Sequence, residues 1–217
     1  MSPKNQIPRL MRRFTQIVAV AIVSHLASAN GQSITTLFAS NNNGSPGGAI
    51  YFDITVASNP LLITSLDLNT SSTSPFSNLQ VWILPGMTSQ GHETNMALWT
   101  EVATGSGTGA GTNNPTHVTL SNPFGLNAGT LYGIALVADP SFGHYYTNGN
   151  GSNQNYSNAD LSLFLGSATN VPFTAPVFSP RVWNGTIYYS VVPEPSTMAL
   201  LGLGALAVIG FARRRAR

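Results

Sequence analysis

The chain between residues 33 and 190 contains no stretch in which a helical stripe of apolar residues continues over ten positions. Its apolar residues instead recur at every second position, the period of a strand with one face in a protein core. Two runs, 50–56 and 62–68, show this period most clearly. Their apolar sets are Ile50, Phe52, Ile54 and Val56 in the first and Leu62, Leu66 and Leu68 in the second. This pattern indicates β structure throughout the central part of the chain.

Further short runs, separated by Gly, Pro, Asn and Ser, extend the pattern. They are residues 79–84, 96–103, 117–120, 131–138, 161–165 and 186–191. Residues 132–137 are apolar on both faces, which predicts a central strand. About eight strands at this spacing predict an all-β fold, an antiparallel β-sandwich of jelly-roll-like or immunoglobulin-like arrangement. The glycine-rich residues 104–112 and the asparagine-rich residues 146–158 are predicted to be surface loops.

Charged residues are segregated along the chain. Of the nine Lys and Arg residues, four lie in the first 13 positions and four in the last five, so that only Arg181 lies between. Residues 30–191 also hold four Asp and two Glu, which gives this body a formal charge of −5. A negative body argues against nucleic acid as its partner. The absence of cysteine excludes disulfides, thiolate metal sites and cysteine nucleophiles.

The N-terminus has the three parts of a secretory signal peptide. Residues 1–13 are basic, residues 14–26 are apolar, and Ala27-Ser28-Ala29 has the small-x-small pattern that signal peptidase cleaves. We expect residues 1–29 to be the signal peptide, with cleavage after Ala29. The alternatives are an uncleaved anchor helix and, from the pair Arg12-Arg13, a twin-arginine signal.

The C-terminal residues 192–217 also have three parts. Pro193-Glu194-Pro195 forbids helix and presents an extended backbone. Residues 198–212 are apolar and, as a helix, would reach about 22 Å, less than the roughly 30 Å hydrocarbon core of a bilayer. Arg213, Arg214 and Arg215 follow and are expected to act as a cytoplasmic stop, which places residues 30–191 outside the inner membrane.

This tail resembles the PEP-CTERM sorting signal over about the last 26 residues, with Pro193, Glu194 and Pro195 as its sorting motif. The resemblance implies recognition by an exosortase, an integral-membrane processing enzyme of the transpeptidase kind. It also implies a Gram-negative bacterium that makes exopolysaccharide and biofilm. The expected location is the inner membrane before processing and the cell surface or extracellular space afterwards. An ordinary tail anchor is the alternative, and the resemblance does not extend to the body.

Aromatic residues supply the best candidates for binding in the body. Exposed flat rings stack on the apolar faces of sugars. Tyr145 and Tyr146 stand beside the asparagine-rich segment and are a candidate sugar contact. Trp82 and Trp99 are more typical of core packing.

Candidates for catalysis and metal binding are sparse. Glycoside hydrolysis needs two carboxylates, and Glu93 and Glu101 are the only glutamates of the body. His92 and His144 match no short metal-ligand spacing, so no metal site or other cofactor is expected. A structural calcium ion is an alternative for the aspartates, which are Asp53, Asp67, Asp139 and Asp160.

Signal, β domain and sorting tail together predict a non-catalytic exported protein associated with exopolysaccharide. A carbohydrate-binding, lectin-like module is the first alternative, and an exported glycoside hydrolase is the second. Its expected partners are an exosortase, the inner membrane before processing and extracellular polysaccharide.

Overall fold

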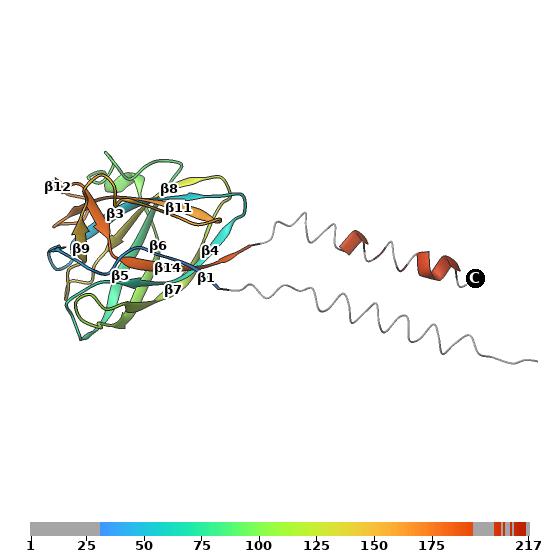
Figure 1. Ribbon diagram of the computed structural model, residues 1–217, viewed down its shortest axis with the longest axis horizontal. Helices are drawn as coiled ribbons and strands as arrows, with labels where there is room; N and C mark the ends of the chain where they lie inside the picture. The colour runs from blue at the N-terminus through green and yellow to red at the C-terminus, as the bar shows by residue number, and fades with distance from the viewer. Residues whose placement is uncertain (1–30, 193–201, 205, 207–208, 210, 216–217) are drawn as a thin grey trace, which may run out of the picture. The chain divides into compact units, whose positions relative to one another are not determined.

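The computed structural model describes residues 31–192, 202–204, 206, 209 and 211–215. Residues 31–192 belong to one compact unit, called the β domain here, and the described residues of the tail belong to another. The strands of the β domain (Figure 1) are β1 (Gln32–Thr35), β2 (Asn42–Asn43), β3 (Ala49–Val56), β4 (Leu61–Leu68), β5 (Pro75–Pro85), β6 (Thr100–Thr108), β7 (Thr116–Leu126), β8 (Leu131–Val137), β9 (Tyr145–Asn148), β10 (Asn155–Ser157), β11 (Leu161–Thr169), β12 (Val177–Phe178), β13 (Arg181–Trp183) and β14 (Gly185–Val191). A single turn of 3-10 helix, η1 (Met96–Leu98), precedes β6.

The strands are antiparallel, which confirms the predicted all-β antiparallel class. Ten of them follow one another in the order β1-β14-β4-β7-β6-β5-β8-β3-β11-β10, β12 pairs with β11, and β13, β9 and β2 form a small second sheet. The strands at the two ends of this order, β1 and β10, contact each other, so the large sheet is nearly closed. The predicted strands are therefore not divided between two separate sheets, as in a jelly-roll or immunoglobulin sandwich. Register shifts interrupt the pairing of β4 with β14, of β5 with β6 and of β11 with β3, and an extra residue at such a point bends a strand, which lets one sheet turn a corner.

The main core lies inside this curled sheet. Phe52 of β3 stacks on Trp183 of β13, with ring centroids 4.9 Å apart and planes 7° from parallel. β8 lies between β5 and β3 and is buried over six of its seven residues, which confirms the predicted central strand. The small sheet thus packs one of the largest buried side chains of the domain against the middle of the large sheet.

A second apolar cluster covers the outer face of β3, β8 and β5. Tyr51, Trp99 and Phe173 meet edge to face there, at centroid distances of 5.8 and 5.9 Å from Tyr51. The predicted half-buried character of residues 50–56 is therefore wrong, because Tyr51 and Asp53 are also buried. A periodic strand pattern cannot reveal that a distant segment folds back over the polar face.

For residues 62–68, the prediction of which side chains point into the core is wrong at the N-terminal end of the strand. Leu61 and Ile63 point into the core together with Leu66 and Leu68, whereas Leu62 is only half-buried. The pairing of β4 with β14 skips Thr64, which is the extra residue of a β-bulge, and the register of β4 against β7 shifts at the same point. An extra residue reverses the alternation, so the strand needs it to keep both apolar halves inside.

The glycine-rich residues 104–112 are not a loop over their first half. β6 continues to Thr108, with Gly105 opposite Leu120 of β7 and Leu79 of β5. Glycine is required here because a Cβ on Gly105 would overlap the side chain of Val118, and one on Gly107 would overlap the carbonyl oxygen of His117. These glycines let strands and core approach closely, a role that composition alone does not distinguish from flexibility.

The asparagine-rich residues 146–158 are likewise shorter as a loop than predicted. β9 and β10 occupy both ends, which leaves residues 149–154 as the turn. Asn150 closes this turn by accepting hydrogen bonds from the backbone N–H groups of Ser152 and Asn153. Asparagine therefore serves local turn chemistry at this position.

We predict that Gly107→Ala destabilises the β domain by about 1–3 kcal/mol, because the added methyl group meets a backbone carbonyl that cannot move without opening β6 from β7. Urea unfolding of residues 31–192 measures the effect. Gly125→Ala in β7 is the control, since its nearest neighbour lies 4.0 Å from the added Cβ. Equal stability of the two variants would contradict the packing role of Gly107.

Candidate functional site

A polar face covers the outside of β14, β4, β7 and β6. We call it the hydroxyl face and define it as the outward side chains of Ser65, Asp67, Thr104, Ser106, Thr108, His117, Thr119, Ser121, Thr186 and Tyr188, together with Ser77 of β5. The residues that alternate with them along the same strands, such as Leu66 and Val118, point inward and are buried in the core. Alternation along the strands thus separates an apolar interior from a surface of hydroxyl groups.

Among the residues that define the hydroxyl face, Asp67 is the only carboxylate. It is 5% exposed, and its two oxygens accept hydrogen bonds from Nδ1 of His117 at 3.0 Å and from the hydroxyl of Tyr188 at 2.7 Å. A carboxylate only accepts, so Nδ1 of His117 carries the hydrogen and Nε2 is left without one in the neutral ring. The bond to Asp67, burial and the charge of Asp67 raise the pKa of Tyr188. The cluster fixes His117, whose side chain is 60% exposed, with a hydrogen-bond acceptor toward solvent.

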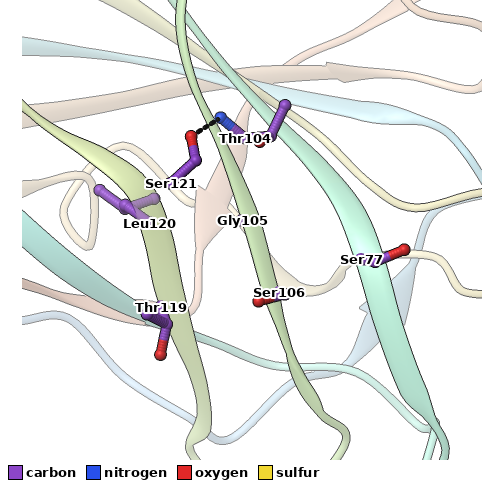
Figure 2. Close-up of a pocket in the computed structure, with 7 residues that line it drawn as sticks. All are labelled: Ser77, Thr104, Gly105, Ser106, Thr119, Leu120 and Ser121. Atoms are coloured by element: carbon purple, nitrogen blue, oxygen red, sulfur yellow. Dashed lines mark hydrogen bonds between the residues drawn. The ribbon is translucent and has the colours of Figure 1, made fainter.

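A shallow groove lies beside this cluster on the same face. It has a volume of about 190 Å³ and is lined by Ser77, Thr104, Gly105, Ser106, Thr119, Leu120 and Ser121. Figure 2 shows these residues on three neighbouring strands, with Gly105 between the hydroxyl-bearing side chains. The backbone N–H of Thr104 donates to Oγ of Ser121 at 3.1 Å, so β6 and β7 separate at this point. The hollow lies where the two strands separate.

The sequence did not point to this cluster. Asp67 and His117 are 50 residues apart, and only the register of β4 against β7 places them opposite each other. The alternating pattern of the sequence does place all four polar residues on outward positions of their strands; these are Asp67, His117, Thr119 and Tyr188. That pattern assigns residues to an outer face, but it does not pair the strands.

The predicted sugar contact at Tyr145 and Tyr146 needs correction. Tyr146 is 4% exposed and belongs to the core, where its ring lies 5.7 Å from the guanidinium carbon of Arg181. It is therefore not an exposed stacking platform, because its side chain packs in the main core. Tyr145 is half-buried, and a sugar contact there stays a prediction.

The two glutamates of the body lie in different environments. Glu93 is 6% exposed and accepts a hydrogen bond from Oγ of Ser167 at 2.7 Å, which the sequence did not indicate. Glu101 is exposed in β6, opposite Trp82 of β5. No contact found among the described residues joins the two carboxylates. Trp99 is buried in the second apolar cluster, and Trp82 is half-buried at its margin.

The aspartates and histidines proposed as ligands occupy separate places. Asp53 accepts from the backbone of Ser89, Asp160 from the hydroxyl of Tyr189, and Asp139 from the backbones of Ser77, Asn78 and Ser141. Partial burial works against ionisation of Asp139, but a hydrogen bond from the Ser141 hydroxyl together with these backbone bonds outweighs it and lowers the pKa of Asp139. Within residues 31–192 and the described tail positions, no three of His, Asp and Glu gather at one point.

His144 is a core residue. Nε2 donates to the carbonyl of Leu136 at 3.0 Å, and Nδ1 is buried with no hydrogen-bond partner. Burial lowers the pKa of His144 to about 4, and the bond to Leu136 opposes this only in part. His92 lies elsewhere, with Nδ1 bonded to the carbonyl of Thr88.

Most residues of the two predicted sorting segments lie outside the described residues, including Ala27, Ala29, Pro193, Glu194 and Pro195. Arg213, Arg214 and Arg215 are described, helical and exposed. Among the described residues, no helix has both the length and the apolar character needed to span a bilayer.

Comparison with known proteins identifies the tail. Residues 191–216 match the family model of the PEP-CTERM protein-sorting motif, which confirms the resemblance. The motif implies an exported protein that is sorted by an exosortase. A comparison of the chain with curated proteins gives no match.

We predict that neutral His117 carries its hydrogen on Nδ1, because Asp67 can only accept. Nitrogen-15 NMR of histidine-labelled protein at pH 8 reports this tautomer. Asp67→Ala is expected to shift the hydrogen toward Nε2, whereas Tyr188→Phe retains the acceptor and is expected to leave the tautomer unchanged. A hydrogen on Nε2 in the parent protein would contradict the assigned bond.

We also predict that the β domain loses stability as the pH falls from about 6.5 to 4. In this range the unfolded chain protonates His144 and the folded protein does not, so the unfolded state binds more protons. The full contribution is about 3 kcal/mol, and it no longer changes below pH 4. Urea unfolding across this range should give a shallower pH dependence for His144→Gln, and equal slopes for parent and variant would refute the prediction.

Proposed function

We propose that this chain is an exported, non-catalytic protein that is displayed at the cell surface or in the extracellular matrix. There its β domain takes a structural or adhesive part in an exopolysaccharide matrix. The observation that carries the proposal is the PEP-CTERM motif at residues 191–216, which follows directly on the last strand of the β domain.

The position of the motif suits removal of the tail from an intact domain. β14 ends at Val191, and the last hydrogen bond of this segment runs from the backbone N–H of Val192 to the carbonyl of Pro60 at 2.8 Å. A cut near Pro193-Glu194-Pro195 would therefore fall beyond the sheet. In the proposed route, residues 198–212 hold the chain at the inner membrane and Arg213–Arg215 stay cytoplasmic until an exosortase acts.

The surface chemistry of the β domain supports a role in a sugar-rich environment. Serine and threonine make up most of the hydroxyl face, which holds no Lys or Arg, and hydroxyl groups exchange hydrogen bonds readily with sugar hydroxyls. A catalytic role finds less support, because Glu93 is occupied by Ser167 and Glu101 has no paired carboxylate among the described residues.

The test is to produce the full chain in a Gram-negative host with and without an exosortase. With the enzyme, mass spectrometry is expected to find a protein that starts at Asn30 and lacks the apolar residues 198–212. Without it, or with Glu194→Ala, the tail should remain and the chain should fractionate with the inner membrane. Glu101→Ala, at an exposed position in β6, is the control and should be processed normally.

Recovery of the intact chain from the cytoplasm, resistant to protease added outside spheroplasts, would overturn the proposal. Such a result would mean that neither end of the chain directs export.

A further inference from the structure

The hydroxyl face combines three features that a binding surface for polymers needs. It is continuous across β14, β4, β7 and β6, it is hollowed beside Gly105, and His117 is held in one orientation by Asp67. We infer that this face binds a neutral polysaccharide, with one sugar unit in the groove and its neighbour against His117. The inference rests on the proposed function, since it names the partner of the β domain and the site.

The charges of the domain favour binding of a neutral polysaccharide over binding of an anionic one. Arg181 is the only cation among residues 31–192, and its guanidinium is occupied by the rings of Tyr146 and Phe178 and by the carbonyl of Pro180. Among the residues that define the hydroxyl face, there is no Lys or Arg that could neutralise a uronic acid or a sulfate. The formal charge of −5 would instead repel an anionic chain.

The groove offers the hydrogen-bonding groups that a sugar requires. Ser106 and Thr119 are opposite each other in the β6–β7 register, and both are exposed. Each hydroxyl can donate one hydrogen bond and accept two, so the pair can adapt to either role of a sugar hydroxyl. The volume of about 190 Å³ is smaller than the roughly 300–1,000 Å³ of pockets that enclose a drug-sized ligand, so the groove suits one unit of a longer chain.

His117 extends the site along the same strand. It precedes Thr119 by two residues of β7 and therefore lies about 7 Å away on the same face. With the hydrogen on Nδ1 engaged by Asp67, Nε2 presents an acceptor for a sugar hydroxyl. A fixed acceptor loses less conformational entropy on binding than a freely rotating one.

A shallow site is consistent with a protein displayed in many copies. A single groove with few contacts binds weakly, but a repeating polymer can engage several surface-bound copies at once, and the second contact then forms within one assembly.

The experiment measures retention of the full chain, in detergent, on immobilised neutral polysaccharides (dextran, cellulose, a β-1,3-glucan and a galactomannan) and on anionic alginate. The double variant Ser106→Ala/Thr119→Ala should weaken binding to the retained neutral polysaccharide by about tenfold or more, since it removes two hydrogen-bonding hydroxyls. His117→Ala should weaken it by about fivefold. The control Thr55→Ala/Ser162→Ala removes an exposed hydroxyl pair that is likewise opposite in register, between β3 and β11, and should bind as the parent does.

The outcomes separate this inference from the proposed function. If the parent binds a neutral polysaccharide and the Ser106/Thr119 variant binds equally well, the site is wrong and the proposed function stands. Binding to alginate alone would also overturn the site, because it contradicts the charge argument. If the chain binds none of these polymers but is exported and processed, the inference fails while the sorting part of the proposal stands.

Discussion

The pairing of β4 with β14 on one side and β7 on the other determines both the core and the outer face of this domain. It places Leu66 and Leu68 inside and, in the same register, sets Asp67 beside His117 and Tyr188. A slip of one residue would turn Asp67 into the core and leave a buried charge without partners, at a cost of several kcal/mol. The apolar interior and the polar cluster therefore stabilise the same register.

The period-two pattern predicted the class of the fold and the positions of β3, β8 and β14, because burial of one face dominates the energetics of these strands. It failed where one residue changes the geometry, as at Thr64, whose bulge reverses the faces of β4. It also failed at Gly105 and Gly107, since glycine marks both flexible loops and places where strands approach closely. A single sequence does not show which strands pair, so it could not predict the contact between Asp67 and His117.

The scarcity of charge has different effects inside and outside the domain. Buried carboxylates such as Asp53 and Glu93 have no cationic partner among the described residues and are stabilised by hydroxyl and backbone N–H donors. Hydrogen bonds to an ionised group are stronger than those between neutral groups, so these donors can take the place of a cationic partner. On the surface the same scarcity leaves hydroxyl groups as the main means of recognition, and these distinguish ligands by geometry more than by attraction at a distance.

The sorting motif and the hydroxyl face use different residues of the chain, so each can vary without the other. The sorting motif begins where β14 ends, so processing requires only an accessible segment and an intact domain edge. Recognition by the hydroxyl face requires the register of four strands and the glycines between them. Substitutions on the outer positions of β6 and β7 would therefore change the ligand without altering export, whereas substitutions of their inner residues would remove recognition, because they unfold the core that holds the strands in register.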